Sequence, residues 1–225
     1  MSVPIAYHSL LTSTVTILTL ATHAECKKIN LAGSQEEPEN DSSFAGSPYA
    51  VAKWSARNYA KMFCNLYHIP VINPRIFMVY GPNQRNYKKL IPYVILSFLK
   101  NEAPKRTNGS RPVDWIYIED VIDALIHGAV SNLNIDIPFH IGTGIQITVK
   151  DIVNKVIQIM GSPVKPLFGF HADRPLERIT RADADNMLLE PKVSLDEGLY
   201  RTVQWVKRNF IKITDSDEYL QICSA

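Results

Sequence analysis

Apolar residues recur along this chain with two different spacings. A spacing typical of helices, with apolar positions three or four residues apart, runs through six segments: 9–24, 48–69, 90–100, 119–130, 148–160 and 195–210. Short apolar runs typical of buried strands lie between them, at 27–33, 71–79, 115–118 and 139–142. Because strands and helices alternate, the pattern predicts an α/β fold built on a mostly parallel sheet.

Polar residues mark where several of these helices begin. Ser47 is a good N-cap, and Pro48 suits the first position of a helix. Thr148 and Ser194 are each followed three residues later by an acidic residue, which is the capping-box pattern. The segments 34–47 and 161–191 are polar or rich in proline, and we expect loops there.

Composition narrows the classes of function. Hydrophobic residues make up 46% of the 225 residues, charged residues 20%, and the net charge is +2. This is ordinary globular composition, and the near-neutral charge argues against nucleic acid as a partner. The three cysteines form no C-x-x-C pair, which favours a reducing, cytoplasmic location. The histidines do not cluster, so we expect no metal site.

The N-terminal segment is apolar and needs a separate interpretation. Residues 10–21 look like the apolar part of a signal peptide, but no Lys or Arg precedes them. The segment is also short for a bilayer span. We therefore expect a buried helix, with no role in secretion or in a membrane.

Tyr49 and Lys53 form the first candidate catalytic pair. They are four residues apart on a predicted helix, so their side chains share a face. A nearby ammonium favours the phenolate and lowers a tyrosine pKa, which lets the phenol exchange a proton with a sugar hydroxyl. Ser34 follows a predicted strand, where it is placed to hold the same oxygen. The alternative is a partly buried tyrosine beside a solvated lysine, because Y-x-x-x-K alone is a weak motif.

Six short motifs occur in an order that resembles one family. They are LAGSQEEP (31–38), SPYAVAK (47–53), RIFMVYGP (75–82), KLIP (89–92), DWIYIEDV (114–121) and DRP (173–175). Together they resemble the extended short-chain dehydrogenases/reductases, in the NAD-dependent nucleotide-sugar epimerase/dehydratase group. The resemblance implies a Rossmann-like domain from 1–82 and 112–142. A small substrate lobe from 83–111 and 143–225 would complete the fold.

The resemblance also implies roles for individual residues. The implied catalytic residues are Ser34, Tyr49 and Lys53. The residues expected against NAD or NADP are Gly33, Tyr49, Lys53, Arg75 and Ile76. Those expected against a nucleotide-diphosphate sugar are Ser34, Gln35, Glu36, Tyr80, Lys89, Leu90, Arg111 and Arg174. Relatives are usually dimers, and Trp54, Ala60 and Phe63 would allow a homodimer, although the same residues suit a plain core.

Two arginines are the candidates for the diphosphate, because a guanidinium makes bidentate bonds to phosphate oxygens. Arg174 is the first choice and Arg111 the second. The alternative for each is a surface ion pair, with Asp173 or Asp114. The implied function is an NAD(P)-dependent epimerase or 4-ketoreductase.

The sequence departs from the family in four places, one of which is a shorter stretch at 183–191. None of the ten glycines forms the G-x-x-G-x-x-G turn that holds the dinucleotide pyrophosphate. The resemblance begins partway through the cofactor domain, so we expect the first strands to be missing and the sheet to be incomplete. Gln35 stands where dehydratases carry an aspartic acid, which favours an epimerase or a 4-ketoreductase. Val113 stands where many relatives carry an arginine.

The missing glycine turn leaves two hypotheses open. This chain alone is expected to bind NAD or NADP weakly or not at all. One hypothesis is an enzyme. In that case the chain is either a fragment of the enzyme, or another chain supplies the missing half. The other is a catalytically inactive remnant or interaction protein that kept the second half of the fold.

Overall fold

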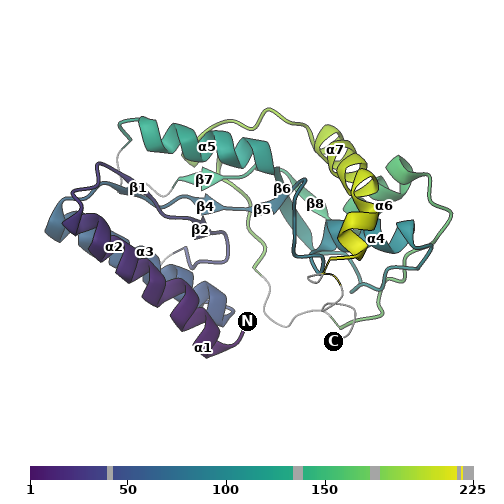
Figure 1. Cartoon of the computed structure of the whole chain (residues 1–225), viewed down its shortest axis with the longest axis horizontal. Coiled ribbons are helices and arrows are strands. Elements are labelled where there is room, and N and C mark those ends of the chain that lie inside the picture. Colours follow the sequence, from purple (N-terminus) through teal and green to yellow (C-terminus); the bar gives the residue numbers. More distant parts are fainter. Residues whose placement is uncertain (40–42, 134–138, 173–177, 217–218, 220–225) are drawn as a thin grey trace.

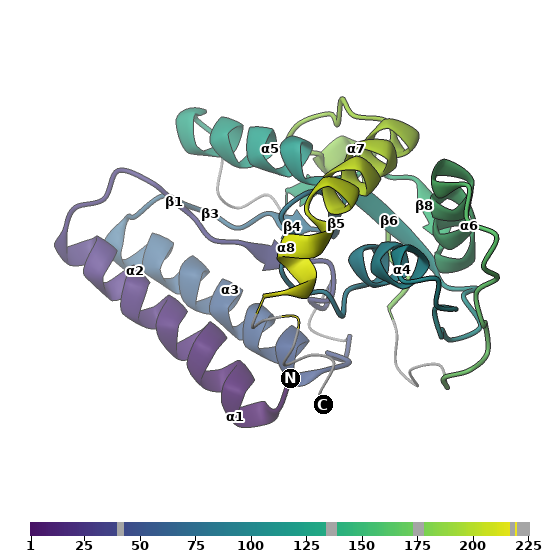
Figure 2. The same ribbon diagram turned by 45° about the vertical axis from the view of Figure 1, so that its right-hand side comes forward.

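The computed structural model describes residues 1–39, 43–133, 139–172, 178–216 and 219 of the chain. Figure 1 shows strands in a central layer, with α5 (Ile118–Val130) on one face. Two helices, α2 (Ser13–His23) and α3 (Pro48–Tyr67), lie side by side on the other face. Figure 2 shows four more helices gathered at the other end of the molecule: α4 (Leu90–Leu99), α6 (Val149–Met160), α7 (Leu195–Arg208) and α8 (Phe210–Thr214).

The strands form short, mostly parallel ladders, as predicted. They are β1 (Ile29–Asn30), β2 (Gly33–Ser34), β3 (Val71–Ile72), β4 (Arg75–Ile76), β5 (Met78–Tyr80), β6 (Pro112–Tyr117), β7 (His140–Ile141) and β8 (Gln146–Thr148). Parallel pairs join β1 to β3, β2 to β4, β4 to β7 and β5 to β6. The antiparallel pair of β6 with β8 was not predicted. Among the described strands β2 pairs only with β4, so its other edge has no partner strand.

The predicted strand at 71–79 is divided into β3, β4 and β5. Pro74 lies between the first two and has no N–H to give to a ladder. Its carbonyl still accepts a 3.0 Å bond from the Gly33 N–H, so the two chain segments stay side by side. The same stretch of chain therefore contributes to four ladders, which belong to three sheets.

The predicted helix starts are confirmed. The Ser47 side chain accepts a 3.1 Å bond from the Ala50 N–H at the start of α3. Thr148 accepts a 3.1 Å bond from Asp151 at the start of α6, and Ser194 accepts from Glu197 at the start of α7. The loop between α6 and α7 contains the 3₁₀ turn Ala184–Asn186.

The N-terminal helix differs from the prediction. It starts at α1 (Val3–Ala6), passes through a π-helical turn at Tyr7–Thr12 and continues as α2. Several hydroxyls of this threonine-rich segment donate to carbonyls four residues earlier, for example Thr14 to Leu10 at 2.6 Å, so they are satisfied within the helix.

The prediction of a buried N-terminal helix was wrong. Only one narrow side, which includes Ala6, Leu18 and Ala21, is buried. The prediction that the segment is too short to span a bilayer was also wrong. Val3–His23 is long and apolar enough by length and composition, and it is the one such helix found among the described residues. The same test is passed by signal sequences and by helices of soluble proteins, so it is weak evidence for a membrane span.

Three apolar clusters hold the layers together. The largest packs α4, α6 and α7 against β6 and includes Ile95, Val153 and Leu199. A second packs α5 against the strands, and a third lies between α2, α3 and β3. Ala60 and Phe63 are buried in the third cluster, so they pack within the chain and not at a dimer surface. The homodimer and the proposed domain boundaries stay predictions.

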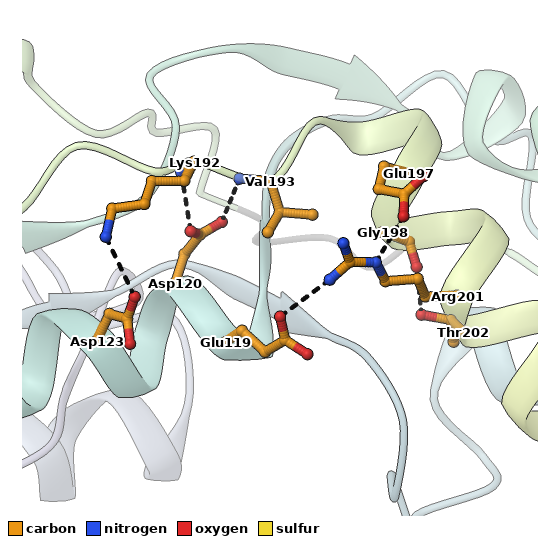
Figure 3. Close-up of polar contacts among 9 residues, drawn as sticks. All are labelled: Glu119, Asp120, Asp123, Lys192, Val193, Glu197, Gly198, Arg201 and Thr202. Carbon is orange, nitrogen blue, oxygen red and sulfur yellow. Dashed lines mark hydrogen bonds and ion pairs between the residues drawn. The ribbon is translucent and has the colours of Figure 1, made fainter.

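Polar contacts at the start of α5 attach the C-terminal helices to the sheet (Figure 3). The buried Asp120 carboxylate accepts bonds of 2.8 and 3.2 Å from the Lys192 and Val193 backbone N–H groups. Glu119 and Glu197 both contact the Arg201 guanidinium, at 3.1 and 2.6 Å. The side chains of Glu119, Glu197 and Arg201 are largely exposed. We therefore expect the buried Asp120 contacts to contribute more to the free energy of unfolding.

Asp120→Ala is expected to lower the free energy of unfolding by about 2 kcal/mol, because two backbone donors lose a charged acceptor. Asp123→Ala is the matched control on the same helix. Its carboxylate makes only an exposed 3.5 Å pair with the Lys192 ammonium, and we expect a loss below about 0.5 kcal/mol. Urea unfolding of both variants measures the difference. Equal losses would show that the Asp120 bonds contribute nothing specific.

Candidate active site

A cavity of about 500 Å³ lies at the carboxyl ends of β2 and β4. Ligands gather at these strand ends in parallel α/β sheets. The structure brings eight of the predicted site residues together in its wall. They are Gly33, Ser34, Gln35, Glu36, Tyr49, Lys53, Ile76 and Lys89.

Gly33 places the following serine close to the neighbouring strand. A Cβ at this position would lie 2.7 Å from the Pro74 carbonyl oxygen and 2.9 Å from a carboxylate oxygen of Glu37. Both contacts are too short for a side chain, so only glycine fits. Ser34, the next residue, is buried at the end of β2 and faces the cavity.

Lys53 connects α3 to the residue that precedes the same strand. Its ammonium donates a 2.8 Å bond to the Ala32 carbonyl and lies 6.0 Å from the centre of the Tyr49 ring. The capped start of α3 puts Tyr49 in the first turn, and the four-residue spacing puts Lys53 one turn later. The two side chains share the cavity, as predicted.

Ser47 and Glu36 hold the polar loop against α3. The Ser47 hydroxyl donates to a Glu36 carboxylate oxygen at 3.3 Å, while it accepts from the Ala50 N–H. The Glu36 N–H donates to the Ser34 hydroxyl oxygen at 3.2 Å. The serine oxygen is therefore oriented by its own loop.

Glu37 is a site residue that the sequence did not reveal. Its carboxylate is fully buried, accepts a 2.7 Å bond from the Ser34 N–H, and lies 3.8 Å from the Arg57 guanidinium. Burial raises the pKa of Glu37, and the Ser34 bond and the Arg57 charge oppose that rise. In the sequence it is one of several acidic residues in a loop, so no local signal singled it out.

The pKa of Tyr49 is raised above its ordinary value of 10, chiefly by burial. A side-chain hydrogen bond with Ser34 lowers it, and the charges of Glu36 and Glu37 raise it further. Burial also lowers the pKa of Lys53, against the attraction of Glu37. Lys53 is not among the causes of the Tyr49 shift, and its ammonium is bonded to the Ala32 carbonyl, so its effect on the Tyr49 pKa stays a prediction.

Four of the predicted site residues lie away from this cavity. Successive residues of a strand point to opposite faces, so Ile76 faces the cavity while Arg75 points elsewhere and donates to the Pro38 carbonyl. Tyr80 is buried, and its hydroxyl donates to the Leu195 carbonyl at 3.4 Å. The Tyr80 side chain packs against Gly198. Leu90 packs against the largest apolar cluster.

Arg111 precedes β6 and does not line the cavity. Its backbone carbonyl accepts a 3.0 Å bond from the Val149 N–H. Val113 is buried in the largest apolar cluster. Arg174, the first choice for a diphosphate, lies outside the described residues.

The described residues contain no group of three or more His, Cys, Asp or Glu that could hold a metal ion. His140 accepts a 2.9 Å bond from the Asp183 N–H at its Nδ1.

The Tyr49 phenol is expected to ionise above pH 10, because burial disfavours its charged form. The difference between wild type and Tyr49→Phe in the ultraviolet absorbance of phenolate measures this midpoint. Lys53→Met should leave the midpoint nearly unchanged. A midpoint below pH 10 that rises in Lys53→Met would instead show that the ammonium controls the phenol.

Comparison with known proteins agrees with this arrangement. A sequence profile of the NAD dependent epimerase/dehydratase family matches residues 5–141. The chain is 24% identical to a dTDP-D-glucose 4,6-dehydratase from Mus musculus, over 83% of this chain and 55% of that protein. It is 28% identical to a UDP-glucose 4-epimerase from Mycolicibacterium smegmatis, over 77% of this chain and 56% of that protein. The chain thus spans slightly more than half the length of these relatives.

The fold is shared with solved epimerases. The structure of UDP-glucose 4-epimerase with UDP-glucose from Thermotoga maritima superimposes with a TM-score of 0.81 at 25% identity. The match covers 93% of this chain and 75% of that structure. The Rossmann-like α/β fold expected from the motifs is therefore confirmed. With the profile matching more than half of its residues, the chain belongs to the NAD-dependent epimerase/dehydratase family.

Proposed function

We propose that this chain carries the proton-transfer half of a nucleotide-sugar epimerase or 4-ketoreductase. The observation that supports it is the shared cavity of Ser34, Tyr49 and Lys53 at the strand ends. The Ser34 and Tyr49 side chains are hydrogen-bonded to each other there, so both hydroxyls can reach one substrate oxygen.

The chemistry follows from the protonation state of Tyr49. A phenol with a raised pKa is neutral at pH 7, so it can donate its proton to the oxygen of a 4-ketosugar as the carbonyl is reduced. Ser34 holds that oxygen in line with the phenol. In the opposite direction the phenolate takes the proton from the sugar hydroxyl. A bound nicotinamide would supply the hydride for the reduction and would accept it in the opposite direction.

The other wall residues indicate the substrate class. Gln35 has an amide, which cannot act as the acid that a dehydration needs, so an epimerase or a reductase fits better. The Glu36 carboxylate is bonded to Ser47 and orients the loop. Lys89 adds a cation to the wall, which suits the diphosphate of a nucleotide sugar.

The residues present fit only part of the cofactor. The cavity has room and polar groups for a ribosyl-nicotinamide, with Lys53 beside Tyr49. A pyrophosphate needs a turn of closely spaced glycines before a helix, and the ten glycines of this sequence have no such spacing. The edge of β2, where a further parallel strand would pair, has no partner among the described strands.

This 225-residue chain is expected to bind NAD+ and NADP+ weakly or not at all, because the pyrophosphate has no cradle. Calorimetric titration with each dinucleotide measures the affinity. Lys53→Met is the control, since any weak binding at the nicotinamide end should be lost with the ammonium. A low-micromolar dissociation constant for either dinucleotide would contradict the expectation.

A second candidate function is a catalytically inactive remnant or interaction protein of the same family. The same missing glycine turn favours it, and so does the unpaired edge of β2. Such a protein would keep the fold around Tyr49 without using its hydroxyl. Turnover separates the two candidates.

Turnover is tested by mixing the chain with UDP- and GDP-sugars and NAD+, and with their 4-keto forms and NADH. Tyr49→Phe should lower any rate by about 100-fold or more, because it removes the proton donor. Tyr59→Phe is the matched control, since Tyr59 is exposed on the same helix and does not line the cavity. Equal rates for wild type and Tyr49→Phe would remove Tyr49 from the mechanism, and no turnover at all would favour the inactive candidate.

A further inference from the structure

A second cavity of about 350 Å³ lies next to the first, and Gln35 lines both. Its wall is formed by α3, β4, β7 and the segment 180–186. Three arginines, Arg57, Arg75 and Arg181, line it together with His140. None of these four residues lines the cavity that holds Tyr49. The second cavity is therefore lined by a set of basic side chains different from the one that lines the first cavity.

Arg75 is the most informative of the arginines. It is only 7% exposed, although a buried guanidinium loses its hydration. One amino group donates to the Pro38 carbonyl, while Nε finds no acceptor among the described residues. Burial lowers the pKa of Arg75 most, the charges of Arg57 and Arg178 lower it further, and the charges of Glu37 and Glu39 raise it. A buried guanidinium N–H without an acceptor is a place where an anion would be stabilised.

Two carboxylates, Glu39 and Asp183, also line this cavity, and both are already engaged. Glu39 pairs with Arg178 at 2.9 Å. Asp183 accepts from the Asp185 N–H at 3.2 Å and from the Asn186 side chain at 2.7 Å, so it caps the 3₁₀ turn. The nearest Glu37 oxygen is 3.8 Å from Arg57, which is too long for a hydrogen bond. The arginines of the wall are thus incompletely compensated.

His140 adds a neutral donor to the same wall. Its Nδ1 accepts from the Asp183 N–H, so the proton of the neutral ring is on Nε2. Burial and the charge of Arg75 both lower the pKa of His140, which keeps the ring neutral at pH 7. The wall therefore offers three guanidinium groups and an imidazole N–H.

We propose that this second cavity binds a phosphate group, either as free inorganic phosphate or as the terminal phosphate of a small metabolite. Guanidinium groups match the oxygens of a tetrahedral dianion with bidentate, charge-assisted bonds. The volume is at the lower end of the range of small-molecule sites. The site is separate from the proton-transfer site, because Tyr49 and Lys53 take no part in it.

Isothermal titration calorimetry of the full chain with inorganic phosphate at pH 7 and constant ionic strength tests the proposal. Glycerol 3-phosphate and succinate form two further arms. Stronger binding of glycerol 3-phosphate than of inorganic phosphate would identify a metabolite phosphate as the source, and the reverse order would identify the free ion. Succinate, which has planar carboxylates, should bind more weakly than both.

Arg181→Gln should weaken phosphate binding by about tenfold, because one charged donor is lost. Arg181 is exposed, so this variant should fold normally. Arg208→Gln, which changes an exposed arginine of α7 outside the cavity, should have no effect on phosphate binding. Absence of phosphate binding at millimolar concentrations would overturn the proposal. An equal loss in Arg208→Gln, or succinate binding as tightly as phosphate, would also overturn it.

Discussion

Glu37, through its buried carboxylate and its backbone carbonyl, joins three parts of the chain around the candidate site. One oxygen accepts the Ser34 N–H at 2.7 Å, and the other faces Arg57 of α3 at 3.8 Å. Its backbone carbonyl accepts a 2.9 Å bond from Arg178, far along the chain. A fully buried carboxylate is tolerated only when donors and positive charges surround it. Removing Glu37 would leave the Ser34 N–H and Arg57 without their shared partner.

This arrangement explains which parts of the site were predictable. Ser34, Tyr49 and Lys53 belong to short motifs whose geometry follows from a strand end and from one turn of a helix, so local pattern was enough. The same is true of the Ser47 cap, which the structure confirms at 3.1 Å. Glu37 owes its role to Arg57, twenty residues away on another element, and no local spacing encodes that pairing.

The predicted placements that differ from the structure also depend on contacts between distant segments of the chain. Arg75 and Ile76 were assigned to one binding site because they are adjacent in a motif, yet a strand sends them to opposite faces. Tyr80 was expected at the substrate, but a glycine at position 198 on α7 lets its ring pack inward. The N-terminal helix was expected to be buried because it is apolar, and only its contact side with α3 is covered. In each case a distant segment decided the outcome.

The protonation of Tyr49 shows how the site and the fold are coupled. Burial alone favours the neutral phenol, and the acidic loop that holds Ser34 adds charges that favour it further. The Lys53 ammonium donates a hydrogen bond to the carbonyl of Ala32, the residue before β2. To stabilise a phenolate, positive charge would have to come closer to the ring than the 6.0 Å at which the ammonium now lies. The chain as folded therefore presents an acid, and its use as a base depends on a charge that a bound ligand would bring.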